Sequence, residues 1–382
     1  MASATQLPLK SITFTTALLV AAGLSRVNIH KLLVSTFTGP GSYSRIAVLA
    51  VVLANLKNVP YAWHFRVWNG ILKHCLFSIP RYPRSTPKPS TLFLPIITTS
   101  HSPVAECDYN LHKSNSTYFA DLDVSRSHLV CCLFQPGIDA LQHNPARQLV
   151  TDAAGKPVKG RWGIMLGAVH CSFKREIKPY EPYEMWSRML CYDRKWIYIV
   201  THFVKAGTVR PSAYILGDGS WFGGKNALKR GAKVRGEADD ELDQKAIFAS
   251  ALSKYVVKLG RLTIHPEVMM EASGMLPPRP SGWANMRGEV AAAGAAAPAS
   301  VEDSYIEFEF LSRENGNGSG SESASSDEGK HGAEEEWDWK RTVAMNEKGL
   351  KLAEHFAALD ALQDEFTGSK EPALGRYRDF LL

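Results

Sequence analysis

At 382 residues, 45% of them hydrophobic, the chain can bury one large core or two ordinary ones, which excludes a wholly disordered protein. Its net charge of +6 is unevenly divided: residues 1–105 carry ten Lys and Arg but no Asp or Glu, and the rest carries 34 basic and 38 acidic side chains. The six cysteines show neither CxxC nor Cys/His spacing, so a zinc site and a disulfide framework are not indicated. Reduced thiols in a cytosol-facing domain are expected.

The first segment, residues 1–89, is basic and apolar. Fifteen uncharged residues lie between Lys10 and Arg26, and eleven lie between Arg45 and Lys57. Both runs are shorter than the roughly 20 apolar residues of a spanning helix, so a segment that inserts into or lies on an anionic membrane surface is predicted. A mitochondrial transit peptide and a basic soluble helical subdomain are the alternatives.

The sequence becomes β-rich after residue 90 and then helical. Residues 90–107 are mainly apolar and predict a strand. Residues 114–134 carry apolar side chains at helical spacing and predict a long helix that ends at the Gln-Pro-Gly stretch beginning at Gln135. Residues 135–160 then predict a loop.

Three strand-like runs follow, at residues 162–173, 183–192 and 196–205. The turns between them are short, which predicts antiparallel neighbours. In the third run both alternating sets of side chains are mostly apolar, so both faces of that strand should be covered. The order of strand, long helix and consecutive antiparallel strands predicts an α+β fold in which a curved sheet surrounds one central helix.

A polar cluster lies where the long helix is predicted to begin, formed by Asp108, Asn110, His112, Asn115 and Tyr118. Backbone N–H groups at a helix N-terminus would stabilise a substrate oxygen that becomes anionic during reaction, and Asp108 is a candidate base beside them. The alternative is that Asp108 and His112 are only turn and capping residues, and that Tyr118 only packs in the core.

This cluster carries a family resemblance. The pattern Asp-x-Asn-x-His-x-x-Asn-x-x-Tyr at residues 108–118 resembles the opening motif of hotdog-fold acyl-CoA thioesterases of the 4-hydroxybenzoyl-CoA type, and the similarity continues to about residue 216. The sequence departs from the common pattern at Leu111, where many members have glycine, and at Lys113 and Ser114, where an apolar residue and asparagine are commoner.

Two further segments, the basic and apolar residues 1–89 and residues 337–362, show a narrower resemblance. Both are similar to membrane-anchored thioesterase-like proteins of animals and fungi, including those encoded beside fungal natural-product clusters such as the leucinostatin cluster. The implied setting is fungal lipid or secondary-metabolite biosynthesis, on a membrane, with the catalytic domain facing the cytosol.

The resemblance implies hydrolysis of acyl thioesters carried by coenzyme A or by a phosphopantetheine protein. Asp108 would be the nucleophile or the base that activates water. The oxyanion would be bound by backbone N–H groups near the helix start, those of Asn115, Ser116 and Thr117. Three further side chains would lie on the substrate side of the site: Asn110, His112 and Tyr118. The resemblance also implies that Asn110, His112 and Asn115 order the loop.

The resemblance also implies a homodimer, since one such sheet leaves an open edge and the family's sites lie between subunits. No cofactor, metal or nucleic-acid partner is expected. The alternative function is a catalytically inactive acyl-binding or scaffold protein of the same fold, which Leu111 and the lack of a second obvious catalytic group would favour.

Residues 219–226 nearly match a phosphate-binding loop, but Asn226 replaces the Ser or Thr that binds magnesium, so a glycine-rich turn is the better interpretation. The turn leads into a basic patch that could meet the phosphates of coenzyme A or a membrane, or could simply be a solvated face. The patch comprises Lys225, Lys229, Arg230, Lys233 and Arg235.

The C-terminal third completes the expected organisation. Residues 243–260 predict an amphipathic helix. The segments expected are a membrane-associating head (1–89), a hotdog domain with a helical extension (90–283), a low-complexity linker (284–335) and a C-terminal helical segment (336–382). Apolar spacing in the last segment predicts a helix that docks on the body.

Overall fold

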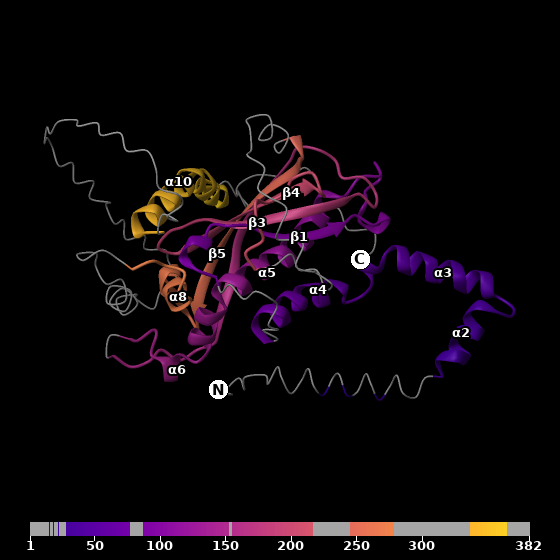
Figure 1. Ribbon diagram of the computed structural model, residues 1–382, viewed down its shortest axis with the longest axis horizontal. Coiled ribbons are helices and arrows are strands. Elements are labelled where there is room, and N and C mark those ends of the chain that lie inside the picture. Colours follow the sequence, from indigo (N-terminus) through magenta and orange to yellow (C-terminus); the bar gives the residue numbers. More distant parts are fainter. Residues whose placement is uncertain are drawn as a thin grey trace, which may run out of the picture.

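The computed structural model describes residues 28–76, 87–152, 155–216, 245–278 and 337–364, together with Thr15, Leu18 and Ala22. Figure 1 shows one curved sheet with a long helix along one face and a C-terminal helix on the other. The glycine-rich stretch at 219–226, the basic patch and the linker at 284–335 lie outside the described residues. So does most of the apolar run between Lys10 and Arg26.

The sheet is antiparallel throughout, in the order β1-β3-β4-β5-β2, with β6 paired to β5. Its strands are β1 (Ile96–His101), β2 (Trp162–Phe173), β3 (Pro182–Tyr192), β4 (Trp196–Lys205), β5 (Ile247–Leu259) and β6 (Leu262–Ile264). The three strand segments predicted from the sequence are confirmed, each to within one residue. The prediction that they are antiparallel neighbours holds for β3 and β4 but is wrong for β2, which pairs with β5 while β3 pairs with β1, so the chain between β2 and β3 crosses to the other side of the sheet. The two ends of the sheet are β1 and β2, and β2 is an unpaired edge within the described chain.

The sheet curves around α5 (Asn115–Gln142), which is 28 residues long. Tyr118, Leu122 and Leu129 lie on one side of this helix, pack in the core against the sheet and are at most 2% exposed. A curved antiparallel sheet around one central helix is the hotdog fold, so the predicted fold class is confirmed.

The prediction that this helix ends near Gln135 is wrong. Pro136 lies inside α5, and the helix continues to Gln142 before the short α6 (Asn144–Arg147). Proline removes one N–H from the helix ladder, and the next N–H, that of Gly137, donates to Ser273 Oγ at 3.0 Å. A Cβ on Gly137 would lie 2.3 Å from the Met269 carbonyl oxygen, so the glycine permits close packing against α8 (Pro266–Ala272). Packing after the proline therefore sustains the helix.

The predicted helix at residues 243–260 is also wrong, because this segment forms β5. The strand pairs with β2 on one side and β4 on the other, and side chains on both of its faces are buried. Burial on both faces hides the alternation by which a strand is recognised. Its Ala, Leu and Lys content also suits a helix, so pattern and propensity were both misleading.

The C-terminal helical segment covers the outer face of the sheet. It consists of α10 (Trp339–Ala357) and the 3₁₀ helix η6 (Ala358–Gln363), as predicted for a docking helix. Tyr198 on the outer face of β4 packs with Phe356 of α10, whereas Ile197 and Ile199 on its inner face belong to the core beneath α5. The Asn346 side chain bonds both the N–H (2.7 Å) and the carbonyl (3.0 Å) of Tyr192, which fixes α10 to the end of β3. Both faces of β4 are therefore covered, as its sequence predicts.

Residues 28–76, here called the N-terminal arm, precede the sheet. The arm contains α2 (Ile29–Phe37), α3 (Ser42–Ala54), the 3₁₀ helix η1 (Leu56–Asn58), α4 (Ala62–Ile71) and the π-helical turn η2 (Leu72–Leu76). In Figure 1, α2 and α3 extend away from the sheet, whereas α4 lies along α5. No single helix among the described residues is long and apolar enough to cross a membrane; His30–Phe37 and Ser42–Ala54 together would qualify, but they bend by 107° between them.

The arm and the hotdog domain share a buried contact. Gly70 of α4 lies against the His128 ring of α5, and His74 Nε2 lies 3.1 Å from His128 Nδ1. Burial lowers the pKa of both His74 and His128 to about 4, so the pair is neutral at pH 7. Contacts therefore cross the boundary that the sequence places at residue 89.

Candidate active site

The predicted catalytic motif forms a tight turn between β1 and α5. Cys107 and Lys113 pair across the turn, and the Asp108 N–H donates to the His112 carbonyl at 2.9 Å. Asp108 Oδ1 accepts the N–H of Asn110 at 2.9 Å and, more weakly, that of His112 at 3.5 Å. Oδ2 has no hydrogen-bond partner among the described residues. One carboxylate oxygen therefore orients Asp108, as the turn-residue alternative requires, while the other is available for chemistry.

Leu111 occupies the tip of this turn with φ of 60°. Left-handed backbone is costly for a residue with a Cβ and favours glycine. Leu111 is 65% exposed, so its side chain gains little from packing. The glycine that many family members carry here suits this backbone, and this chain retains the turn with leucine in its place.

The first turn of α5 begins next to Asp108. The Thr117 N–H donates to the Ser114 carbonyl at 3.0 Å. The prediction that it is a free donor is therefore wrong. The N–H groups of Asn115 and Ser116 donate to no acceptor in the described chain, as is usual at a helix start. Two donors at the positive end of the helix dipole therefore point out of the N-terminus of α5.

The remaining predicted site residues differ in their surroundings. His112 Nε2 lies 2.9 Å from Glu176 Oε2, which braces the turn against the loop after β2. Asn110 is exposed. Tyr118 is 2% exposed and packs edge-on against the rings of Phe173 and Phe203, so it belongs to the core below the first turn of α5. Of the proposed substrate contacts, Lys225, Lys229 and Arg230 lie outside the described residues.

Below the turn lies a group of charged side chains, here called the ion cluster: Lys57, Arg66, Glu106, Lys113 and Asp121. The side chains of Lys113 and Asp121 are fully buried, those of Glu106 and Lys57 are 4% and 5% exposed, and that of Arg66 is 24% exposed. Glu106 Oε2 accepts from Lys113 Nζ at 2.6 Å and from Lys57 Nζ at 2.8 Å. Both carboxylates are thus bridged by the same two lysines.

Asp121 is the most heavily bonded member of the ion cluster. It pairs with Lys57 and Lys113 at 2.9 Å each and with Arg66 at 2.6 Å, and it accepts a short hydrogen bond from the Tyr183 hydroxyl. Burial alone would raise the pKa of Asp121, but the three cations outweigh it and hold that pKa well below its usual range. Burial lowers the pKa of Lys57 despite the two carboxylates. Removing one partner of such a buried pair typically costs about 3–5 kcal/mol of folding free energy.

The ion cluster is not predicted from the sequence, although the sequence contains one signal for it. Asp121 lies on the face of α5 that also carries Tyr118 and Leu122, so an acidic residue interrupts an apolar stripe. A buried carboxylate requires a cation. The identity of that cation could not be predicted, because Lys57 lies 64 residues earlier in the chain.

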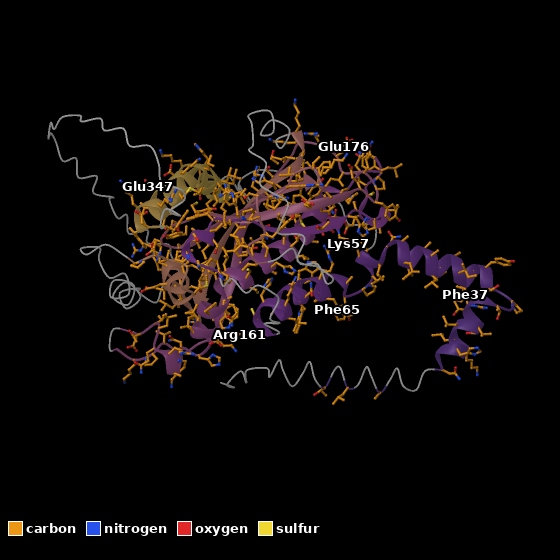
Figure 2. All side chains as sticks on the ribbon, in the orientation of Figure 1. Phe37, Lys57, Phe65, Arg161, Glu176 and Glu347 are labelled. Atoms are coloured by element: carbon orange, nitrogen blue, oxygen red, sulfur yellow. The ribbon has the colours of Figure 1, made fainter. Side chains whose placement is uncertain are left out.

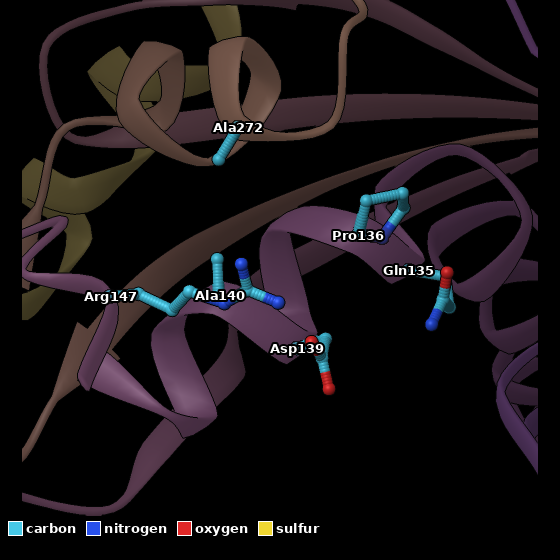
Figure 3. Close-up of a pocket in the computed structure, with 6 residues that line it drawn as sticks. All are labelled: Gln135, Pro136, Asp139, Ala140, Arg147 and Ala272. Atoms are coloured by element: carbon cyan, nitrogen blue, oxygen red, sulfur yellow. The ribbon is translucent and has the colours of Figure 1, made fainter. Parts of the chain in front are cut away.

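A groove lies at the other end of α5 from the turn, as Figure 3 shows. Its volume is about 330 Å³, and it is lined by Gln135, Pro136, Asp139, Ala140, Arg147 and Ala272. Gln135, the first lining residue on α5, lies 20 residues along the helix from Asn115, so roughly 30 Å of helix separates the groove from the turn that carries Asp108. The C-terminal end of a helix dipole is negative and would destabilise an oxyanion, so this groove does not suit thioester chemistry. No group of three or more potential metal ligands occurs in the described ranges.

Comparison with known proteins identifies the family. A model of the thioesterase-like superfamily matches residues 102–242, which include the turn, α5 and β2 to β4. The thioesterase poxG of Penicillium oxalicum is 34% identical over 342 residues, 88% of this chain and 90% of the relative. The chain belongs to the thioesterase-like superfamily.

A second fungal relative agrees, and a solved structure is also similar. The thioesterase lcsJ of Purpureocillium lilacinum is 31% identical over 335 residues, 82% of this chain and 89% of the relative. A crystallised 4-hydroxybenzoyl-CoA thioesterase aligns with 47% of this chain and 98% of its own, at 11% identity and a TM-score of 0.29. With its family known, the chain is a thioester hydrolase, and the turn at residues 106–118 is its candidate active site.

The left-handed backbone at Leu111 generates a testable prediction. Leu111→Gly should leave stability unchanged or raise it by up to about 1 kcal/mol, because the relief of a roughly 1–2 kcal/mol backbone cost exceeds the entropy that glycine adds to the unfolded chain. Thermal unfolding of the full-length chain measures this. Leu111→Ala is the matched control, because alanine keeps the strained φ and should give no gain. A clear loss of stability for Leu111→Gly, alongside a neutral Leu111→Ala, would contradict the strain at this position.

Proposed function

We propose that this thioesterase hydrolyses acyl groups held on coenzyme A or on a phosphopantetheine carrier, with Asp108 as the base or nucleophile. The observation that carries the proposal is the juxtaposition of Asp108 with the start of α5. Asp108 Oδ1 is oriented by backbone N–H groups, Oδ2 has no partner in the described chain, and the free N–H groups of Asn115 and Ser116 follow within eight residues.

The chemistry follows from that geometry. A thioester carbonyl whose oxygen receives the N–H groups of Asn115 and Ser116 becomes more electrophilic, and the helix dipole stabilises the negative charge that develops on this oxygen. The Asp108 carboxylate then either removes a proton from an attacking water or attacks the carbonyl carbon itself, with water hydrolysing the resulting anhydride. In both routes the thiolate of the carrier leaves and takes up a proton. His112 keeps its predicted role of ordering the turn.

The Asp108 role is tested by steady-state hydrolysis with detection of the released thiol. Asp108→Asn keeps an oxygen that can accept the turn hydrogen bonds, so folding should be preserved while kcat falls by about 10² to 10⁴ and KM changes little. Asp139→Asn, in the groove at the far end of α5, is the matched control and should retain turnover. Near-normal kcat for Asp108→Asn, with loss of activity in a folded His112→Ala variant, would instead make the histidine the catalytic group.

The same assay addresses the substrate. A panel of straight-chain fatty acyl-CoAs and 3-oxoacyl-CoAs, each repeated on a phosphopantetheine carrier protein, separates a role in lipid metabolism from one in fungal secondary-metabolite biosynthesis. We place the enzyme in one of these two settings because of its likeness to fungal thioesterases.

We propose further that the N-terminal arm binds an anionic membrane surface, with the catalytic domain facing the cytosol. Exposed apolar side chains gather on α2 and α3, including Leu33 (52%), Phe37 (50%), Val48 (64%) and Val51 (63%). No acidic residue occurs before Glu106, so the arm is attracted to anionic lipid. The six cysteines are all unpaired, which suits the reducing cytosol.

Flotation with lipid vesicles tests the membrane proposal. The full-length chain should float with phosphatidylserine-containing vesicles more than with pure phosphatidylcholine vesicles, and Val48→Asp/Val51→Asp should reduce flotation because the two charges oppose insertion. Leu352→Asp, at an exposed position of α10, is the control and should float normally. Equal flotation of the wild type and the double variant would reject the arm as the membrane contact.

We also propose a homodimer formed through the β2 edge. Unpaired strand edges tend to pair, and Met165 (52% exposed) and Leu166 (43% exposed) lie on this one. Sedimentation in detergent should give the mass of a dimer for the wild type. Met165→Lys should give the mass of a monomer, because it places a positive charge on the β2 edge of both subunits. A monomeric wild type would contradict it. Leu352→Asp again serves as the control, because it adds a charge at an exposed position of α10 that is not part of the strand edge.

A further inference from the structure

Lys57 connects the N-terminal arm to the turn that carries Asp108. It lies in η1, between α3 and α4, where the arm meets the body (Figure 2), and its side chain is buried. Lys57 Nζ donates to Glu106 Oε2 at 2.8 Å, to the His101 carbonyl at 3.0 Å and to the Tyr183 hydroxyl at 3.1 Å. With Asp121 at 2.9 Å, a single ammonium group thus contacts the end of β1, the start of the turn, α5 and β3.

The turn is attached to the body at both of its ends by members of the ion cluster. Glu106 precedes the turn, Lys113 ends it, and their side chains meet at 2.6 Å beneath it. The Ser114 N–H also donates to the Glu106 carbonyl at 2.8 Å, so Glu106 helps to position the start of α5. Whatever holds the Glu106 carboxylate therefore sets the position of Asp108 and of the two free N–H groups.

Lys57 is one of only two donors to Glu106 Oε2 in the described chain, and it is the one that the arm supplies. The arm adds a second, independent contact nearby, because Asn55 Oδ1 accepts the Ala105 N–H at 2.9 Å, one residue before Glu106. Arg66, the other arm residue of the ion cluster, contacts Asp121 at 2.6 Å and does not contact the turn. The arm thus contacts α5, through Arg66 and His74, and also contacts the turn, through Asn55 and Lys57.

We infer that Lys57 is a positioning residue for the thioesterase reaction: it makes the N-terminal arm part of the active site by fixing Glu106 beneath the turn that carries Asp108. The inference rests on the proposed function of Asp108 and adds to it. Membrane binding and catalysis are then coupled, because α3, which is proposed to bind lipid, is followed directly by η1, which contains Lys57.

The test compares Lys57→Met with Arg66→Met in the full-length chain in detergent. Both substitutions remove one arm cation from Asp121, but only Lys57→Met also removes a donor from Glu106. Lys57→Met should lower kcat on acyl-CoA by about 10- to 100-fold with a smaller change in KM, because displacement of the reacting groups by about 1 Å affects the transition state most. Arg66→Met should lower the melting temperature while leaving kcat per folded molecule near that of the wild type.

Hydrogen–deuterium exchange provides a readout that needs no turnover. Peptides covering residues 104–118 should exchange faster in Lys57→Met than in the wild type, and they should not do so in Arg66→Met. If Lys57→Met does not fold, Asn55→Ala replaces it, since it removes a single hydrogen bond to the same segment and should give a smaller change in the same direction. These readouts separate the two claims: a wild type inactive on every acyl thioester overturns the proposed function, and exchange still decides the role of Lys57.

Two results would overturn the inference. The first is a folded Lys57→Met variant with the kcat and the exchange of the wild type in residues 104–118. The second is an equal fall of kcat in Lys57→Met and Arg66→Met, with faster exchange spread over the whole domain in both, which would make the effect one of general stability.

Discussion

The structure depends on the neutralisation of two carboxylates buried beneath the active-site turn. Glu106 and Asp121 are almost completely inaccessible to water, and a carboxylate in such a place is tolerated only when cations and hydrogen-bond donors surround it. The hotdog domain contributes Lys113 and the Tyr183 hydroxyl. The N-terminal arm contributes Lys57 and Arg66, so a segment outside the sheet and its central helix is needed to complete the charge balance below the turn.

The two ends of α5 lie in different surroundings. Its N-terminus carries two free N–H groups, and these donors together with the positive end of the helix dipole favour a developing oxyanion. Its C-terminal half runs past Pro136 and ends in the apolar core, held by α8 and by the Gly137 contact. The sheet curves around the whole length, so one continuous helix links a polar reactive end to a packed structural end. Thioester chemistry is therefore expected at only one end of the fold.

Much of the fold could be predicted because most of its strands and its central helix have a recognisable spacing of apolar residues within the segment itself. Strands β3 and β4 are joined by a short turn, and both sets of side chains in β4 are mostly apolar, so the pairing of these strands and the covering of β4 follow from neighbouring residues. The place of β2 does not, because its partner is β5, which comes much later in the chain. The side chains of β5 are buried on both faces of the sheet, so its sequence lacks the apolar–polar alternation of an exposed strand. Its composition favours a helix, and the sequence therefore predicts the wrong element there. Pro136 ended the predicted helix too early, because the compensating donor, Ser273 Oγ, lies 136 residues away in the chain.

The candidate site was predictable in part for the same reason. Asp108 and the helix start at Asn115 are close in sequence, so their juxtaposition could be expected. The Glu106 and Asp121 carboxylates are held by Lys57, and no local pattern pairs residues 49 and 64 positions apart. That Thr117 is not a free donor depends on the detailed backbone of one turn, which residue types do not determine.

The position of the bound thioester can be determined with a substrate analogue. The most direct measurement is an experimental structure of the full-length chain with a non-hydrolysable acyl-CoA thioether, in which CH₂–S replaces the thioester, or with a ketone analogue that retains the carbonyl oxygen. Our account predicts the ketone oxygen within hydrogen-bond distance of the Asn115 and Ser116 N–H groups, with Asp108 Oδ2 next to the carbonyl carbon or to a water beside it. An analogue bound instead in the groove lined by Asp139 and Arg147, with the turn at residues 106–118 empty, would contradict it.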